Sequence, residues 1–131
     1  MSSAPTPVIR HLIVCEEVLI TSPQRVTLVN LINSIRAGAT PFPFMQPQLC
    51  AFLQMTEGRG TGDIHIEIAA SDTDRPILRS PAHTVTFPPD PLEVVGLTFR
   101  IRDCRFPSAG LYWFQCWYNG TMLGQQPLLL R

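Results

Sequence analysis

Hydrophobic and polar residues alternate along two stretches of the chain, and this period of two constrains the fold most strongly. In residues 63–69, isoleucines occupy every second position and are separated by His65 and Glu67. Residues 94–102 repeat the pattern with apolar side chains at every second position. Because successive side chains of a β-strand point to opposite faces, both stretches are predicted to be strands with one buried face.

The rest of the chain also favours strands over helices. The 13 prolines and 8 glycines fall between short runs of β-branched and aromatic residues, and no sustained amphipathic helix is apparent. Short strands at this spacing are typical of a sandwich or barrel. Residues 37–47 are predicted to be a Pro/Gly-rich connection, and 58–62 a turn. Further strands are expected at residues 8–15 or 8–20, 26–36, 49–55, 76–79, 83–87 and in a hairpin within 106–130.

Length and charge bound the class of protein. A chain of 131 residues is expected to form one domain, with residues 1–7 as a disordered tail and residues 8–131 as the folded unit. The 10 acidic residues balance the 10 basic ones, so the net charge is zero. Nucleic acids and anionic membrane surfaces both require a basic field, and neither is therefore expected as a partner.

The N-terminal region predicts a cytoplasmic location. Its apolar run is interrupted by Arg10 and His11 and ends at Glu16 and Glu17, which does not fit a signal peptide. No stretch of the sequence has the length of a membrane-spanning helix. The 4 cysteines are widely spaced without a CxxC pair, and we expect them to be reduced and buried.

The C-terminal residues 106–130 are predicted to form a hairpin that closes on Asn119-Gly120, a pair suited to a type I′ turn. The strand before this turn is apolar on both faces, whereas a small domain needs only one apolar face for its core. The surplus face is therefore predicted to contact a partner, since aromatic residues, Met and amides are typical of interface centres. With a two-residue turn, this face carries Trp113, Gln115, Trp117, Met122 and Gln126, continued by Leu128 and Leu130 if the register holds.

The alternative is that a loop of the same chain covers this face. The connection 37–47 contains Phe42 and Phe44, which could fold over the two tryptophans and make the surplus face part of the core. The two interpretations carry equal weight at this stage.

The segment SAGLYWF, residues 108–114, resembles the tyrosine corner of immunoglobulin-like sandwiches. The resemblance implies an all-β, immunoglobulin-like antiparallel β-sandwich of about eight strands. It implies that the hydroxyl of Tyr112 bonds back to the main chain, and it puts Phe114 where antibody domains have a core cysteine. The aromatic hairpin and its Gln-Pro-Leu tail are also similar to a small bacterial β-sandwich family of unknown function, which supplies no activity.

Three segments carry residues that could bind a ligand or take part in a reaction. The Gly-rich residues 58–62 lack the following helix and the lysine of a phosphate loop, so a hairpin turn is predicted there. His65 and Glu67 share one strand face and could bind a metal with His83 or His11, although outward polar pairs are common on half-buried strands. Cys104 has arginines nearby that could lower its pKa, against the alternative of a core cysteine.

The sequence thus predicts a non-catalytic interaction or self-assembly module without metal or cofactor. Its partner would be a second copy of the chain or another protein. The alternative is a sandwich that binds a small ligand, or a metal through His65, Glu67 and His83. A third hypothesis is an enzyme that uses Cys104.

Overall fold

The structure, a computed structural model, describes residues 6–21, 25–73 and 75–131. Residues 1–5 of the predicted tail lie outside the described residues, whereas Pro7 at its end is buried. Within the described ranges all regular elements are β-strands, which confirms the all-β prediction. No helix in this part of the chain is long and apolar enough to cross a membrane.

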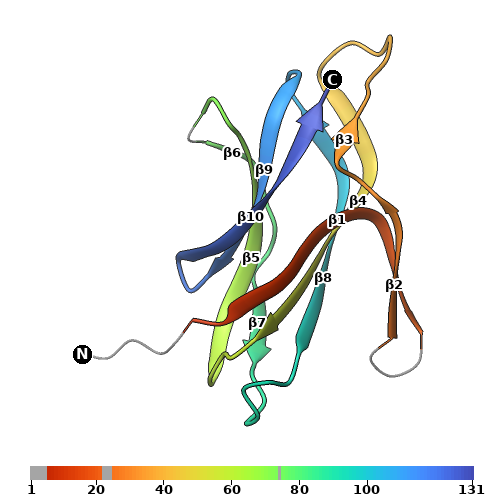
Figure 1. Cartoon of the computed structure of the whole chain (residues 1–131). Helices are drawn as coiled ribbons and strands as arrows, with labels where there is room; N and C mark the ends of the chain where they lie inside the picture. The colour runs from red at the N-terminus through yellow and green to blue at the C-terminus, as the bar shows by residue number, and fades with distance from the viewer. Residues whose placement is uncertain (1–5, 22–24, 74) are drawn as a thin grey trace.

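Two packed sheets of 4 and 6 strands form a sandwich-like arrangement (Figure 1). The four-stranded sheet has the order β2 (Arg25–Leu31), β1 (Val8–Thr21), β4 (Phe44–Thr56), β8 (Val95–Phe106). The six-stranded sheet has the order β3 (Ser34–Ile35), β10 (Thr121–Leu130), β9 (Gly110–Tyr118), β5 (Thr61–Ala70), β6 (Pro76–Arg79), with β7 (His83–Thr86) also pairing with β5. The β3–β10 pair is parallel, and the other pairs are antiparallel.

The core lies between the two sheets and follows the predicted alternation. In β5, Ile64, Ile66 and Ile68 are fully buried, as their spacing predicts. They meet the inward residues of the four-stranded sheet within one continuous cluster. Inward residues of β4, β8, β9 and β10 supply a further part of this cluster: Leu49, Ala51, Leu53, Met55, Phe99, Ile101, Tyr112, Phe114, Cys116, Leu128 and Leu130. Leu12 and Val14 of β1 also belong to it.

Two predicted segments differ from the structure for a topological reason. Residues 26–36 were expected to be one strand, but they divide into β2 and β3, which belong to different sheets. Asn30 has a φ of 54°, so the end of β2 already departs from extended backbone. The connection 37–47 is shorter than predicted, because β4 begins at Phe44, where it pairs with Phe106 of β8.

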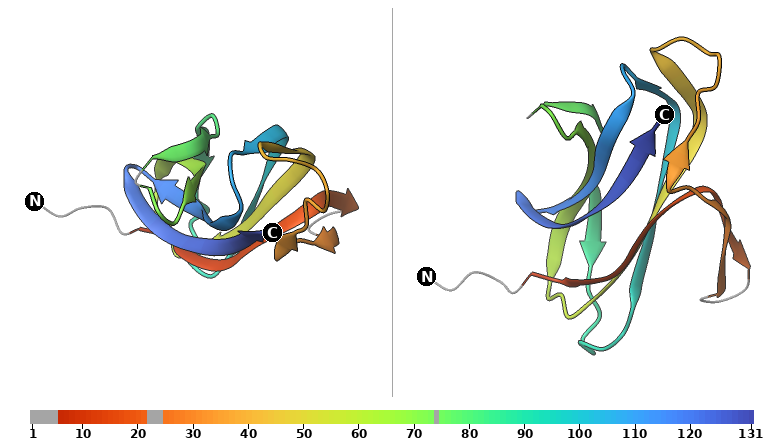
Figure 2. Two further views of the ribbon diagram at one scale, coloured as in Figure 1. Left: turned by 90° about the horizontal axis from the view of Figure 1, so that it is seen from above. Right: turned by 45° about the horizontal axis from the view of Figure 1, so that its top comes forward.

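The four-stranded sheet is strongly curled. The later half of β1 bends out of the plane and carries β2 with it (Figure 2). As a result, side chains on the outer face of the sheet become enclosed, and a second, smaller apolar cluster forms apart from the main core. Its buried members are Cys15, Val18, Cys50 and Phe52, with Leu28 of β2 packed against them.

Candidate functional site

The outer face of β9 carries the residues that the sequence assigns to an interface. Side chains of β9 alternate between buried and half-buried from Leu111 onward, and Trp113, Gln115 and Trp117 are half-buried together with Leu111. Met122 of β10 lies directly opposite Trp117 and is 40% exposed. The strand is therefore apolar on both faces in the structure, with one face in the core and the other at the surface.

The turn of the hairpin follows the prediction, but the register beyond it does not. Asn119 and Gly120 both have positive φ angles, 46° and 82°, which is the requirement of a type I′ turn. A register shift then occurs between Met122 and Gly124, so one extra residue enters β10. Gln125 consequently lies opposite Gln115. In the unshifted register that the two-residue turn predicts, Gly124 would be opposite Gln115.

The shift corrects the prediction for three residues. Gln126 lies opposite the buried Phe114, not opposite Trp113, and its place on the outer face is taken by Gln125. Leu128 and Leu130 are buried in the core and do not continue the outer face. The physical reason is burial: without the extra residue these two leucines would point outward, at a cost of roughly 2 kcal/mol each. We call Trp113, Gln115, Trp117, Met122 and Gln125 the indole face.

Hydrogen bonds order the polar groups of the indole face. Trp117 Nε1 donates to Gln115 Oε1 at 3.3 Å, and Gln115 Nε2 donates to Gln125 Oε1 at 3.4 Å. On the side of β5, the imidazole of His65 stacks parallel to the Trp117 ring, with centroids 6.4 Å apart. These contacts restrict the orientation of the Trp117 indole.

The nearby charges are paired with one another. Glu67 is 8% exposed and lies opposite Gln115. Its Oε2 is 2.7 Å from His65 Nε2 and 3.0 Å from Arg79 Nη2. The border of the indole face on β5 thus carries a neutralised group of charges, which would not repel a second copy of the same surface.

The proposed covering by residues 37–47 does not involve their aromatic side chains. Phe42 and Phe44 pack against the main core between the sheets. Trp113 and Trp117 each keep part of their surface exposed. For these aromatic residues, the alternative in which the loop folds over the indole face is therefore wrong.

Tyr112 makes the contact that the tyrosine-corner resemblance implies. Its hydroxyl donates to the carbonyl oxygen of Ser108 at 2.7 Å and accepts from the Ser108 N–H at 3.3 Å. The side chain is 1% exposed, and its ring meets Phe106 edge-on at 5.0 Å. These bonds fix the entry into β9 and hence the alternation that turns the tryptophans outward.

Replacing Tyr112 by Phe is expected to destabilise the protein by about 1–2 kcal/mol, because the two hydrogen bonds between the Tyr112 hydroxyl and the main chain of Ser108 are lost. Urea unfolding followed by circular dichroism measures this loss. The variant retains the ring and its packing, so the difference reports the hydroxyl alone. An unchanged midpoint would contradict a stabilising role for the corner.

The metal-site hypothesis fails on geometry. His65 and Glu67 face outward, but His83 lies opposite the inward-facing Ile64 and packs on Phe99 at a ring distance of 4.8 Å. His83 is therefore on the other face of the sheet. Throughout residues 6–21, 25–73 and 75–131, no three His, Cys, Asp or Glu side chains are grouped so as to hold a metal ion.

Cys104 is a core cysteine, and the hypothesis of an activated thiol is wrong. Its side chain is 1% exposed, and burial raises the pKa of the thiol to about 11. The strand turns Cys104 toward the core and leaves Arg102 and Arg105 exposed on the other side. Since the thiolate is the nucleophile, a thiol with this pKa is unreactive at neutral pH. Cys15, Cys50 and Cys116 are likewise free and buried.

The Gly-rich residues 58–62 connect β4 of one sheet to β5 of the other, so the predicted hairpin turn is wrong in topology. Aromatic rings lie directly over two of the glycines, Phe87 over Gly58 and Tyr118 over Gly62. The glycines are thus explained by packing, because a side chain at either position would collide with a ring.

Together these features define a two-sheet β-protein with an uncharged aromatic outer face. Residues 10–131 match the model of DUF6941, a family of unknown function, and the chain belongs to this family. No curated protein matches the chain.

Proposed function

We propose that this protein is a non-catalytic self-assembly module, and that two copies associate through the indole face. The observation that carries the proposal is the presence of two half-buried tryptophans beside the exposed Met122 on one sheet face. The exposed part of this patch lies within the roughly few hundred Å² that monomeric proteins commonly show, so its composition and not its area supports the proposal. Aromatic residues and Met are enriched at the centres of interfaces.

A second copy of the chain suits this surface better than a charged partner. A two-fold dimer brings identical patches together, so each charge near the axis meets its own copy. The pairing of Glu67 with Arg79 and His65 limits the repulsion that would result. The zero net charge of the chain adds no overall repulsion between copies. Another protein with an apolar face remains the second candidate partner, whereas nucleic acid and membrane are not proposed.

We further propose that the fold is immunoglobulin-like. In that fold one sheet contains the neighbours A-B-E and the other G-F-C. The order β1-β4-β8 corresponds to the first set, and β10-β9-β5 corresponds to the second. The bond between Tyr112 and Ser108 supports the same assignment. The free cysteines support a reducing compartment, and we propose a cytoplasmic location in a bacterium.

The test is the oligomeric state of the Trp117→Arg variant. Sedimentation velocity over a concentration series should show self-association of the wild-type chain and a monomeric variant, because a symmetric contact would bring two buried arginines together. Circular dichroism should show that the variant is folded, since Trp117 lies outside the core.

Leu92→Arg is the matched control, because Leu92 is 73% exposed and lies in the connection before β8. This variant should associate like the wild type. A wild-type chain that stays monomeric at high micromolar concentration would refute self-association. An equal loss of self-association in Trp117→Arg and Leu92→Arg would show that the indole face is not the contact.

A further inference from the structure

The curl of the four-stranded sheet brings the bent part of β1 close to β8, although β4 lies between these two strands in the order β2-β1-β4-β8. Arg100 of β8 donates from Nη2 to the carbonyl oxygen of Val18 in β1 at 2.9 Å. The outer face of the sheet is therefore concave, and we call this concave face the half-barrel.

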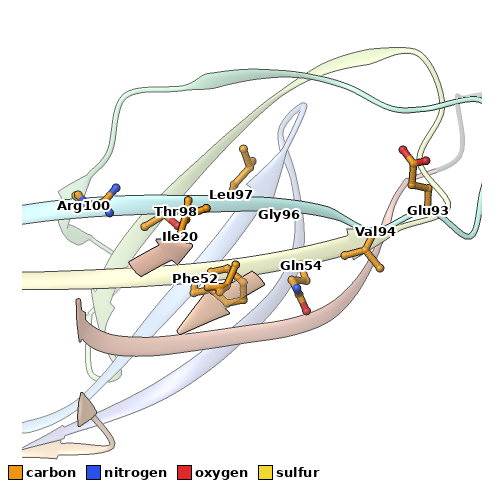
Figure 3. A pocket seen from close by; sticks show the side chains of 10 residues that line it. Ile20, Phe52, Gln54, Glu93, Val94, Gly96, Leu97, Thr98 and Arg100 are labelled. Carbon is orange, nitrogen blue, oxygen red and sulfur yellow. The ribbon is translucent and has the colours of Figure 1, made fainter. Parts of the chain in front are cut away.

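One part of this half-barrel is filled and another is open. The filled part is the small cluster that contains Cys15, Val18 and Cys50. Phe52 belongs to that cluster and also lines a cavity of about 670 Å³ (Figure 3). This volume is within the range of small-molecule sites, which is about 300–1,000 Å³.

The walls of the cavity are mixed in polarity, and their apolar side chains come from both sides of the half-barrel. Ile20 of β1 and its cross-strand partner Val26 of β2 line the cavity together with Phe52 of β4. Val94 lies at one end of the cavity (Figure 3). Ile20 is 68% exposed and Val94 is 51% exposed, although both line a concave surface. An apolar occupant would remove this surface from water, which is the main source of affinity in such sites.

Charged residues mark the two ends of the cavity. Arg100 lies at one end and Glu93 at the other (Figure 3). The Arg100 side chain is 48% exposed; its Nη2 donates to the Val18 carbonyl oxygen and lies 3.4 Å from Glu17 Oε1, so a ligand carboxylate would share the guanidinium with Glu17. The fork of a guanidinium suits a carboxylate, whereas Glu93 would repel one. Between the ends, the half-buried Gln54 and Thr98 offer polar groups on the floor.

We propose that this cavity binds a small amphipathic carboxylate. Its hydrocarbon part lies between Ile20, Val26 and Phe52, and its carboxylate meets Arg100. The cavity is on the four-stranded sheet and the indole face is on the six-stranded one. Ligand binding is therefore independent of the proposed self-association, and either can fail without the other.

The experiment is a titration of the full chain with sodium decanoate, followed by ¹H–¹⁵N correlation spectra below the concentration at which decanoate forms micelles. We expect saturable shifts at Gly96, Thr98 and Val26. Decanol should bind more weakly than decanoate to the wild type, and Arg100→Gln should remove this preference. Absence of saturable shifts with both probes would overturn the proposal, and equal affinities for the two probes would overturn the carboxylate assignment.

A pair of exposed positions separates a specific site from general apolar binding. Ile20→Asp should weaken decanoate binding by roughly tenfold or more, because it places a second anion beside the hydrocarbon chain. Leu31→Asp is the control, since Leu31 is 60% exposed on β2 and does not line the cavity. Equal weakening in both variants would overturn the assignment of the site. Shifts at Gly96 and Thr98 that depend on protein concentration without ligand would identify a second copy as the occupant instead.

Discussion

Phe114→Ala is expected to destabilise the protein by about 3–5 kcal/mol, whereas Trp113→Ala, one residue earlier, should cost about 1–2 kcal/mol. Phe114 is fully buried in the main core and lies between Ile68 of β5 and Gln126 of β10. Its removal leaves a cavity that the surrounding sheets cannot fill. Trp113 is only half-buried on the outer face, so its truncation to Ala loses less buried apolar surface than the truncation of Phe114 does.

Chemical denaturation of the two variants, followed by far-UV circular dichroism, measures the difference. The comparison is controlled within the chain, because both residues are large aromatics at neighbouring positions of β9. A strand shifted by one residue would exchange their faces. A greater loss in Trp113→Ala than in Phe114→Ala would therefore show that the tryptophans are core residues, and the indole face would not exist.

Several strands of this protein are predictable because their burial follows local alternation. Residues 63–69 and 76–79 become β5 and β6 almost without change of bounds. The turn at Asn119-Gly120 is likewise local, since it depends on the backbone preferences of two residues. For the same reason, the outward positions of Trp113, Gln115 and Trp117 followed from the sequence of β9 alone.

The register of β10 could not be predicted from its own sequence. The extra residue near Leu123 has no local signature, and its benefit arises only when Leu128 and Leu130 meet the core of a completed sandwich. The unfavourable position that an unshifted register gives Gln125, beside Phe114, was the available signal. This tertiary effect is why Gln126 was misassigned to the surface.

The cavity on the four-stranded sheet was also missed. Its existence depends on how far β1 bends, which is decided by contacts between Val18, Cys50 and Phe52. A signal was nevertheless present, because β4 is apolar on both faces around Cys50-Ala51-Phe52, as β9 is around its tryptophans. A strand with two apolar faces indicates that the second face is also buried, and in β4 this second face packs against residues of the same chain.

Gly62→Ala is expected to cost about 3 kcal/mol, because a methyl group at this position would collide with the phenol ring of Tyr118. Tyr118 is 4% exposed and sits edge-on to Phe87, so its ring has little room to move. The control is Gly60→Ala in the same connection. Gly60 has a φ of 67° and open space where a side chain would be, so only the backbone cost of about 1 kcal/mol applies.

Thermal unfolding of Gly62→Ala and Gly60→Ala separates a packing role from a conformational one. If Gly60→Ala proves the more destabilising, the glycines are needed for their backbone conformation and not for the close approach of the Tyr118 ring.

A displaced Tyr118 would also move its neighbour Trp117, which lies opposite His65 of β5 and stacks on its imidazole. Gly62→Ala should therefore weaken self-association and cost about 3 kcal/mol of stability, whereas Trp117→Arg should abolish self-association and leave the chain folded with a smaller loss of stability. This difference ties the Gly-rich connection to the indole face through a single aromatic ring.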